Sequence, residues 1–444
     1  MRISTNMIYQ KGVAAIQQQT SGLLNTQQQV STGRRILTPA DDPIASARAL
    51  ELGQSKAVNS QFALNIGYAD DNMKLLEGKL MGVGDILHYT RERAVQAGNS
   101  TLSTADLESL ATDIKSQFEA MFALANSKDG QGDYIFSGYK AGTQPFSGNL
   151  SGVSYDGDQG GRTIQVSASR FMPISLPGSD VFDKTRIIDD SAIGLYPAAA
   201  NKGSESPTVS LADATAVRQA TRYQIAFSQP DPAIAGTYTI ERWGQDGNAV
   251  PWTADELAAL PAGFSWPADG SSVSYTPDPL DPASYQVTLD GLNIDLPADP
   301  VPDPIDAPQE VRQVKDEVTD GDRFEIYVAS TNMLDNLAMF AVALEKPGAS
   351  RNTGAVAFAL DNLDAAQENV LRVRAQIGSQ MVETEQLANL GSDLNIQYAE
   401  AISRLEDVDY AEAISRLTQQ QTYLQAAQQS FMRVTGLSLF NYLN

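Results

Sequence analysis

Two stretches of the chain, one near each end, place large apolar residues seven positions apart. The N-terminal set is Tyr9, Ile16, Leu23, Val30 and Leu37, and the C-terminal set is Tyr410, Leu417, Leu424 and Phe431. Seven residues is the repeat of a coiled coil, so each stretch is predicted to form a helix with a narrow apolar seam. Both stretches are rich in glutamine. The alternate positions of each seam, which lie between successive heptad residues, are often polar, as at Thr20, Gln27, Gln421 and Gln428.

A half-polar seam makes a two-helix coil weak by itself. We therefore predict that the two end helices pair with each other and finish burying their surface only against other subunits. The alternative is a pair of ordinary amphipathic helices that pack on one domain. On the first interpretation, the candidate assembly interface consists of Ile16, Leu23, Val30, Leu37, Leu417, Leu424, Phe431, Leu437 and Leu439.

Longer helical patterns lie between these ends. The sequence DDP at 41–43 is typical of a helix start, and apolar periodicity continues from about 44 to 97. Ser103 and Asp106 resemble a capping box, which predicts a further helix to about residue 127.

Two more helices are predicted in the C-terminal half, at 331–345 and at 354–434. The second would be on the order of 100 Å long if it were continuous, which indicates a rod. It contains an exact repeat, because YAEAISRL occurs at 398–405 and again at 410–417. An offset of twelve residues turns a helix about 120° past whole turns, so the two copies are expected to face different directions.

Strand-like stretches occupy the middle of the chain. A short strand is predicted at 134–136, followed by a small hairpin arrangement up to about residue 176. Turn signals separate further strand-like stretches from each other, and fifteen of the 21 prolines lie between Pro197 and Pro308. These stretches are 222–228, 236–243, 271–277, 284–296 and 322–330.

These elements predict an α+β fold, mainly a helical rod with an inserted all-β outer domain. The terminal coiled-coil layer is expected at 1–40 and 415–444, and a helical bundle with a β-hairpin region at 41–186 and 326–414. An acidic, proline-rich β domain is expected at 187–325, with DPVPDPIDAP at 299–308 as a rigid linker.

Charge is distributed unevenly along the chain. The net charge is −23, which argues against nucleic acid or an anionic membrane as the main partner. Residues 1–40 and 413–444 contain six bases and no acid, whereas residues 187–322 contain 22 acids and 6 bases. Arg34 and Arg35 lie near Asp41 and Asp42 in a polar loop. We interpret these four residues as ion pairs that set the register of the helices, and the alternative is a solvated loop.

Composition also limits the chemistry that the chain can perform. It has no cysteine and a single histidine, His88, which we interpret as a helix-surface residue. Thiolate and multi-histidine metal sites are therefore excluded, and no catalytic residue, metal ligand or cofactor is predicted. There is no apolar run long enough for a membrane span and no stretch typical of a cleaved signal peptide. The protein is expected to be cytosolic or exported by a route that needs no such signal.

Three segments carry a resemblance to a known family. They are MRISTNMIY at the start, STGRRILTPADDPIASARAL at 31–50, and LEDVDYAEAISRLTQQQTYLQAAQQSFMRVTGLSLFNYL at 405–443. Together they resemble bacterial flagellin and its relatives, and the opening MRIST and the end GLSLFNYL are more similar to the hook–filament junction branch of that family. The resemblance covers about 1–185 and 325–444 and leaves out the β insert.

The resemblance implies a structural subunit of the extracellular flagellum with three layers. Paired terminal helices would surround a central channel, a helical bundle would form the middle layer, and the β domain would face outward. It also implies type III export with a chaperone, and three kinds of neighbour: the first hook-associated protein on the hook side, flagellin on the filament side, and further copies in a ring. Nucleic acid and membrane are not expected partners.

Two other functions remain open from the sequence. One is filament flagellin itself, which has the same layers at a different place in the assembly. The other is a carbohydrate-binding or enzymatic outer domain, in which Trp243, Trp252 and Trp266 would stack on sugar or a carboxylate pair would act.

Overall fold

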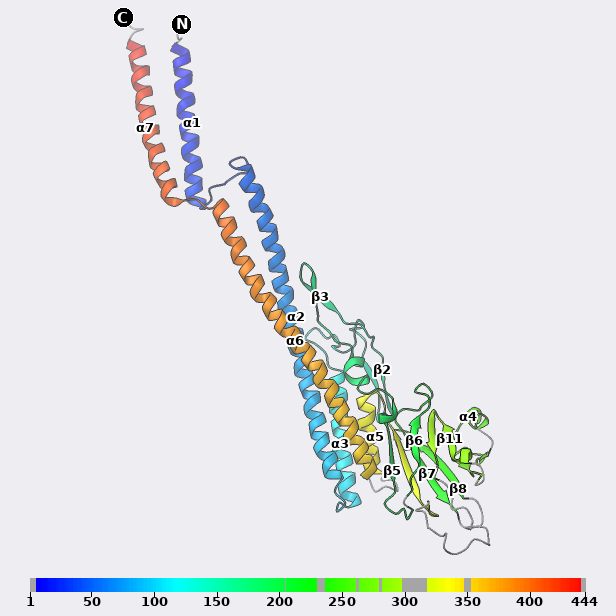
Figure 1. Cartoon of the computed structure of the whole chain (residues 1–444). Coiled ribbons are helices and arrows are strands. Elements are labelled where there is room, and N and C mark those ends of the chain that lie inside the picture. Colours follow the sequence, from blue (N-terminus) through cyan, green and yellow to red (C-terminus); the bar gives the residue numbers. More distant parts are fainter. Residues whose placement is uncertain are drawn as a thin grey trace, which may run out of the picture. The chain divides into compact units, whose positions relative to one another are not determined.

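The computed structural model describes residues 5–203, 205–229, 236–260, 263–278, 282–297, 318–346 and 353–440. The chain divides into two compact units, and Figure 1 labels its helices and strands. The first unit consists of residues 1–67, 165–170 and 384–444, and the second of 68–164 and 171–383. The linker predicted at 299–308 lies outside the described residues.

The first unit contains the two end helices, α1 (Thr5–Thr32) and α7 (Tyr410–Phe440), which lie side by side in Figure 1. It also contains the first part of α2 (Pro43–Ala97) and the last part of α6 (Thr353–Glu406). The Asp42 side chain accepts a hydrogen bond from the backbone N–H of Ala45 at 3.0 Å, as expected for a residue that caps α2.

Two predictions about these helices were wrong. The N-terminal heptad pattern does not continue on a helix to Leu37, because α1 ends at Thr32 and Gly33 has a left-handed backbone with φ +74°. The helix predicted at 354–434 is interrupted between Glu406 and Tyr410. The two YAEAISRL copies therefore end α6 and begin α7, and the predicted rotation between them on one helix does not apply.

The helical part of the second unit consists of the rest of α2, α3 (Thr104–Ala125), α5 (Met333–Glu345) and the rest of α6. The predicted capping box at Ser103 and Asp106 is confirmed, with both of its reciprocal hydrogen bonds present. Ion pairs tie the helices together, from Arg374 of α6 to Glu77 of α2 at 2.6 Å and from Lys115 of α3 to Glu345 of α5 at 2.6 Å.

Two small antiparallel hairpins follow α3. They are formed by β1 (Phe146–Asn149) with β2 (Gly152–Tyr155), and by β3 (Thr163–Ser167) with β4 (Arg170–Pro173). The strand predicted at 134–136 was wrong, because this segment forms turns and a single bridge between Lys128 and Tyr134. Two short helical turns come next, at Ser179–Asp183 and Asp190–Ala192.

The second unit also contains two antiparallel sheets. The six-stranded sheet has the order β5 (Ile193–Pro197), β13 (Arg323–Val328), β7 (Thr221–Ser228), β8 (Thr237–Trp243), β10 (Val273–Tyr275), β9 (Phe264–Ser265). The three-stranded sheet has the order β11 (Gln286–Leu289), β12 (Leu292–Asp295), β6 (Thr208–Leu211). Their shared core is rich in large side chains, and short helices α4 (Ala254–Ala258) and η3 (Pro282–Tyr285) complete the region.

The sheets correct two further expectations. The stretch 284–296 is a hairpin rather than one strand, with its turn at Asp290 and Gly291, which both have positive φ. The predicted domain boundary at 325 divides β13, which lies between β5 and β7 and ends at Val328. The opposite side of β13 contributes Tyr327 to a second core cluster with Met339 of α5 and Phe358 of α6.

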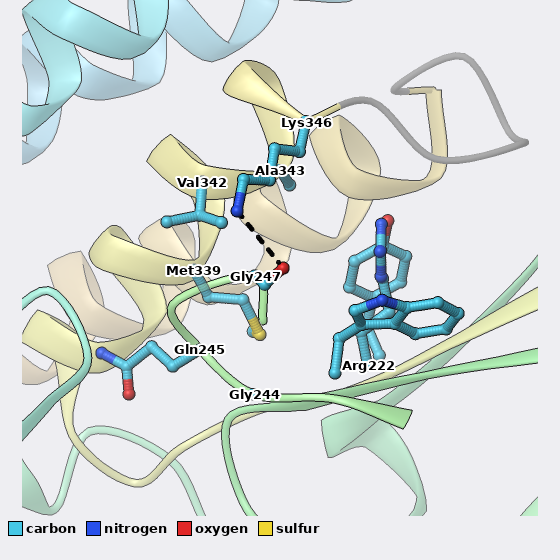
Figure 2. Close-up of a pocket in the computed structure, with 10 residues that line it drawn as sticks. Arg222, Gly244, Gln245, Gly247, Met339, Val342, Ala343 and Lys346 are labelled. Carbon is cyan, nitrogen blue, oxygen red and sulfur yellow. Dashed lines mark hydrogen bonds between the residues drawn. The ribbon is translucent and has the colours of Figure 1, made fainter. Parts of the chain in front are cut away.

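A turn after β8 attaches the six-stranded sheet to α5 (Figure 2). Lys346 Nζ donates to the Gly247 carbonyl at 3.5 Å, and Gln245 Nε2 donates to Asp335 Oδ1 at 2.9 Å. The cavity between them has a volume of about 20 Å³, room for roughly one water molecule. Asp335 also accepts from the Val153 N–H of β2, and burial raises the pKa of its carboxyl group.

Candidate assembly interface

The helices α1 and α7 form an antiparallel pair within one chain. At one end, the rings of Tyr9 and Phe431 lie with their centroids 5.2 Å apart, and at the other, Tyr410 lies beside Gly33. Within this pair, six of the predicted seam residues are half-buried, whereas Tyr9 and Tyr410 are exposed. The six half-buried residues are Ile16, Leu23, Val30, Leu417, Leu424 and Phe431.

Of the four predicted alternate positions of the seam, Thr20 is half-buried as expected, and the other three differ from the prediction. Gln27, Gln421 and Gln428 are exposed, so the seam does not pass through them. The alternate positions are instead Thr26, which is 4% exposed, and Ala413, which is 3% exposed, together with the half-buried Gln420 and Ala427. Three of these four side chains are small, and small side chains allow two helices to approach closely.

Two glycines of α1 lie at this close approach. A Cβ atom on Gly12 would lie 2.6 Å from a ring carbon of Phe431, which is a steric clash. A Cβ atom on Gly22 would lie 3.6 Å from Gln420 Nε2, an ordinary van der Waals distance. Glycine is therefore required by packing at position 12 and not at position 22.

The loop after α1 is joined to the break between α6 and α7 by backbone hydrogen bonds. The Arg35 N–H donates to the Glu406 carbonyl at 2.6 Å, and the Val408 N–H donates to the Gly33 carbonyl at 2.9 Å. Arg35 Nη2 also donates to the Leu405 carbonyl at 2.8 Å. The loop after α1 and the break between α6 and α7 thus hold each other in place at the Gly33–Tyr410 end of the α1–α7 pair.

The four predicted register residues are only partly paired as expected. Arg35 Nη1 lies 3.3 Å from Asp42, but the ion pair of Arg34 is with Glu406 at 3.7 Å. Asp41 instead accepts hydrogen bonds from the N–H groups of Thr38 and Leu37 at 2.7 and 3.0 Å. Backbone hydrogen bonds lower the pKa of both aspartates, chiefly that from Thr38 for Asp41 and that from Ala45 for Asp42.

Two residues where the loop after α1 contacts the break between α6 and α7 were not predicted from the sequence. Ile36 is 9% exposed and lies beside the half-buried Leu37. Glu406 forms an ion pair with Arg34 through its carboxylate, and its backbone carbonyl accepts a hydrogen bond from the Arg35 N–H. Apolar spacing around Ile36 carries no helical signal because the residue lies in a loop. The side chains of Leu437 and Leu439 lie outside the described residues.

Exposed apolar side chains are concentrated in the first unit. Of the 21 large apolar side chains that are exposed in the described residues, thirteen belong to this smaller unit. On the end helices they are Met7, Tyr9, Leu24, Tyr410, Ile414, Tyr423 and Met432. Such density is typical of a surface that another molecule covers.

The single histidine of the chain, His88, lies in the second unit. His88 lies on the surface of α2, where its Nε2 is 3.1 Å from the Gln367 amide, as its interpretation as a surface residue expected. Among the described residues, no three histidine or acidic side chains gather as a metal site requires. No described helix is both long and apolar enough to cross a bilayer.

Two protein-family models match the parts of the chain that contain these end helices. Residues 3–141 match the bacterial flagellin N-terminal helical region, and residues 360–443 match the bacterial flagellin C-terminal helical region. A flagellin of Escherichia coli O127:H6 is 25% identical over 293 residues, covering 66% of this chain and 48% of that protein. The chain therefore has the terminal regions of a flagellin-like protein.

One further relative narrows the class, and a solved structure shows the fold. Flagellar hook-associated protein 3 of Escherichia coli K12 is 30% identical over 440 residues, covering 99% of each chain. A crystal structure of flagellar hook-associated protein-3 from Legionella pneumophila has the same fold, with a TM-score of 0.50, 22% identity, and coverage of 80% of this chain and 98% of that one. The chain belongs to the family of flagellar hook-associated protein 3.

This membership confirms the predicted family, the α+β fold with terminal helices and a central β region, and the location in the extracellular flagellum. The chain is a component of the bacterial flagellum, and its relatives are structural flagellar proteins.

Proposed function

We propose that the chain is an adaptor at the hook–filament junction, which contacts the first hook-associated protein on one side and flagellin on the other. Further copies would complete a ring, and an export chaperone would hold the chain before assembly. The observation that carries this proposal is the half-buried seam of the α1–α7 pair, surrounded by exposed apolar side chains. A helix pair of this kind gains most of its burial from neighbouring molecules.

The candidate interface has two parts in this proposal. The seam residues Ile16, Leu23, Val30, Leu417, Leu424 and Phe431 pair the helices within the chain and so shape the surface. Leu24, Tyr423 and Met432, which are 54%, 51% and 64% exposed, then face other subunits. Leu37, Leu437 and Leu439 stay in the proposed interface as predictions from the sequence.

The four charged residues Arg34, Arg35, Asp41 and Asp42 would fix how the α1–α7 helix pair connects to α2 and α6. Arg35 contacts both Asp42 and the Leu405 carbonyl, and Arg34 contacts Glu406. These contacts favour a register role within the chain over an ion pair between subunits.

Enzymatic or sugar-binding activity of the β region is the less favoured alternative. The guanidinium of Arg222 stacks on Trp243 at 4.7 Å, and that of Arg242 stacks on Trp252 at 3.9 Å. Each stack occupies a ring face that a sugar would need. Trp266 is 43% exposed, so it is the tryptophan whose Trp266→Ala variant should be tested for glycan binding.

Binding to purified neighbours tests the adaptor role against a filament role. We expect the full chain to bind both the first hook-associated protein and flagellin, and to bind flagellin while already bound to the hook-side protein. A chain that binds neither protein contradicts the adaptor role. A chain that polymerises into long filaments on seeding supports filament flagellin instead.

A further inference from the structure

The break between α6 and α7 contains no residue that breaks helices. Residues 404–412 are RLEDVDYAE, with neither glycine nor proline. By contrast, α6 continues as a helix through Gly378 and Gly391, although glycine is a poor helix former. The chain nevertheless leaves the helix after Glu406 and enters it again at Tyr410 (Figure 1). Contacts with another part of the chain therefore hold the break open.

The loop after α1 makes these contacts, and it uses backbone groups that a continuous helix would use itself. In a helix, the Val408 N–H would donate to the carbonyl four residues earlier. Here it donates to the Gly33 carbonyl at 2.9 Å. The carbonyls of Leu405 and Glu406 would accept from N–H groups four residues later. Here they accept from Arg35, from its side chain at 2.8 Å and from its N–H at 2.6 Å. The loop therefore competes with the helix for the same donors and acceptors.

Other terms in the break oppose a continuous helix. The Asp409 carboxylate caps α7, because it accepts from the N–H groups of Ala411 and Glu412 at 2.9 and 3.2 Å. In a continuous helix, Asp409 would lie three residues from both Glu406 and Glu412, and like charges at that spacing destabilise a helix slightly. The separate helices and the continuous helix thus each satisfy the same backbone groups by different partners, as a two-state element requires.

We propose that residues 406–410 are a two-state joint. When the loop at Gly33 and Arg35 is bound, α6 and α7 are separate helices and α7 is held at the end of α1. When the loop is released, α6 and α7 become one continuous helix and this attachment to α1 is lost. The loop-bound form is the one that presents the α1–α7 pair for assembly. The joint itself does not depend on the proposed adaptor role, whereas its use in assembly does.

Replacement of Gly33 tests the joint in the dilute full-length chain. Gly33 has a left-handed backbone with φ +74°, which alanine adopts with difficulty, so Gly33→Ala weakens the bound loop. Carbon-13 chemical shifts of labelled Val408 report whether this residue is helical. We expect these shifts to move toward the helical value, with a ratio of continuous to separate helices about tenfold higher than in the unchanged chain.

Gly53→Ala is the matched control for this measurement. Gly53 lies on α2, where an added Cβ atom would have no contact within 4 Å, so the Val408 shifts should stay as they are in the unchanged chain. Two results for Gly33→Ala would overturn the joint. One is a set of Val408 shifts equal to those of the control, and the other is a set typical of a disordered chain.

A second replacement tests the use of the joint in assembly. Proline is tolerated at the first residue of a helix but not in its interior, so Tyr410→Pro lets α7 begin and blocks the continuous helix. We expect Gly33→Ala to reduce incorporation into flagella about tenfold, and Tyr410→Pro added to it to restore incorporation.

Tyr410→Ala added to Gly33→Ala is the control for this rescue. It also removes the tyrosine ring, whose hydroxyl would lie 3.0 Å from a Cβ atom at position 33, but it leaves the continuous helix possible. It should therefore not restore incorporation. Equal incorporation of the two double variants would overturn the use of the joint in assembly. Normal flagella on cells that lack the chain altogether would overturn the adaptor role instead, and the Val408 shifts would still decide whether the joint exists.

Discussion

The β sheets of the second unit and the α1–α7 pair of the first bury their residues in opposite ways. In the sheets, Tyr223, Tyr238 and Ile240 are fully buried. The hydroxyl groups of the two tyrosines donate hydrogen bonds to Asp290 and to the Pro297 carbonyl. In the described parts of α1 and α7, the buried side chains are Thr26 and Ala413. The sheets therefore stabilise themselves, whereas the helix pair leaves apolar surface for neighbouring molecules to cover.

Replacement of Arg242 is expected to give the largest loss of stability in the β sheets. Its side chain is fully buried and contacts Asp290 at 2.9 Å and Glu256 at 2.6 Å. Arg242→Ala would leave both carboxylates without this partner, so we expect a loss of about 3–5 kcal/mol in the free energy of unfolding. Urea denaturation measures it. Arg218→Ala is the control, because Arg218 pairs with the same acids with a side chain that is 42% exposed, and a similar loss would contradict the role of burial.

Leu424→Asp should break the other region. Leu424 is half-buried in the seam, and an unpaired aspartate buried there in the assembled state would cost about 3 kcal/mol. We expect the β sheets to unfold at an unchanged urea concentration while incorporation into flagella is lost. Gln425→Asp changes the exposed neighbour and should incorporate. Motile cells with normal filaments that contain Leu424→Asp would refute the seam as an assembly element.

The two α1 glycines sharpen the comparison, because each is replaced by the same residue. Gly12→Ala places a methyl group against Phe431 and should weaken the α1–α7 pair by about 1–3 kcal/mol. Gly22→Ala has room and should stabilise α1 by about 0.5–1 kcal/mol. Proteolysis rates of the N-terminal segment in dilute monomer report both effects. Equal rates for the two variants would show that packing against Phe431 does not determine the pairing.

Acid should affect the sheets through Glu256. Burial by itself would raise the pKa of its carboxyl group, but hydrogen bonds from Arg242, the Thr253 N–H and Arg218 together outweigh burial and lower the pKa to about 2. A depressed pKa contributes stability above the ordinary value of 4.5, and this stability is lost as the pH falls toward 2. We expect Glu256→Gln to flatten the dependence of unfolding free energy on pH in this window. An unchanged pH slope would contradict the proposed role of Glu256.

Local patterns predicted most of the elements around these sites. The seven-residue spacing of Ile16, Leu23 and Val30 identified α1, and the capping box at Ser103 identified the start of α3. The turn at Asp290 and Gly291 was missed within a longer strand-like stretch, although Asp-Gly between apolar runs is a hairpin signal. A groove of about 540 Å³ between α2, α6 and the tip of the β3–β4 hairpin was not predicted, because its walls come from three separate parts of the chain.

The sequence by itself determined the end helices, the seven-residue spacing of their seam, the β insert and the family, because periodicity and motifs are properties of neighbouring residues. Only the tertiary structure decided that Arg34 pairs with Glu406, that Gly12 accommodates Phe431, and that β13 lies inside the sheet. Each of these contacts joins residues far apart in the chain, as when Arg35 meets the Leu405 carbonyl across 370 positions. Such partners are selected by packing and by the need to satisfy buried polar groups, which a local pattern does not encode.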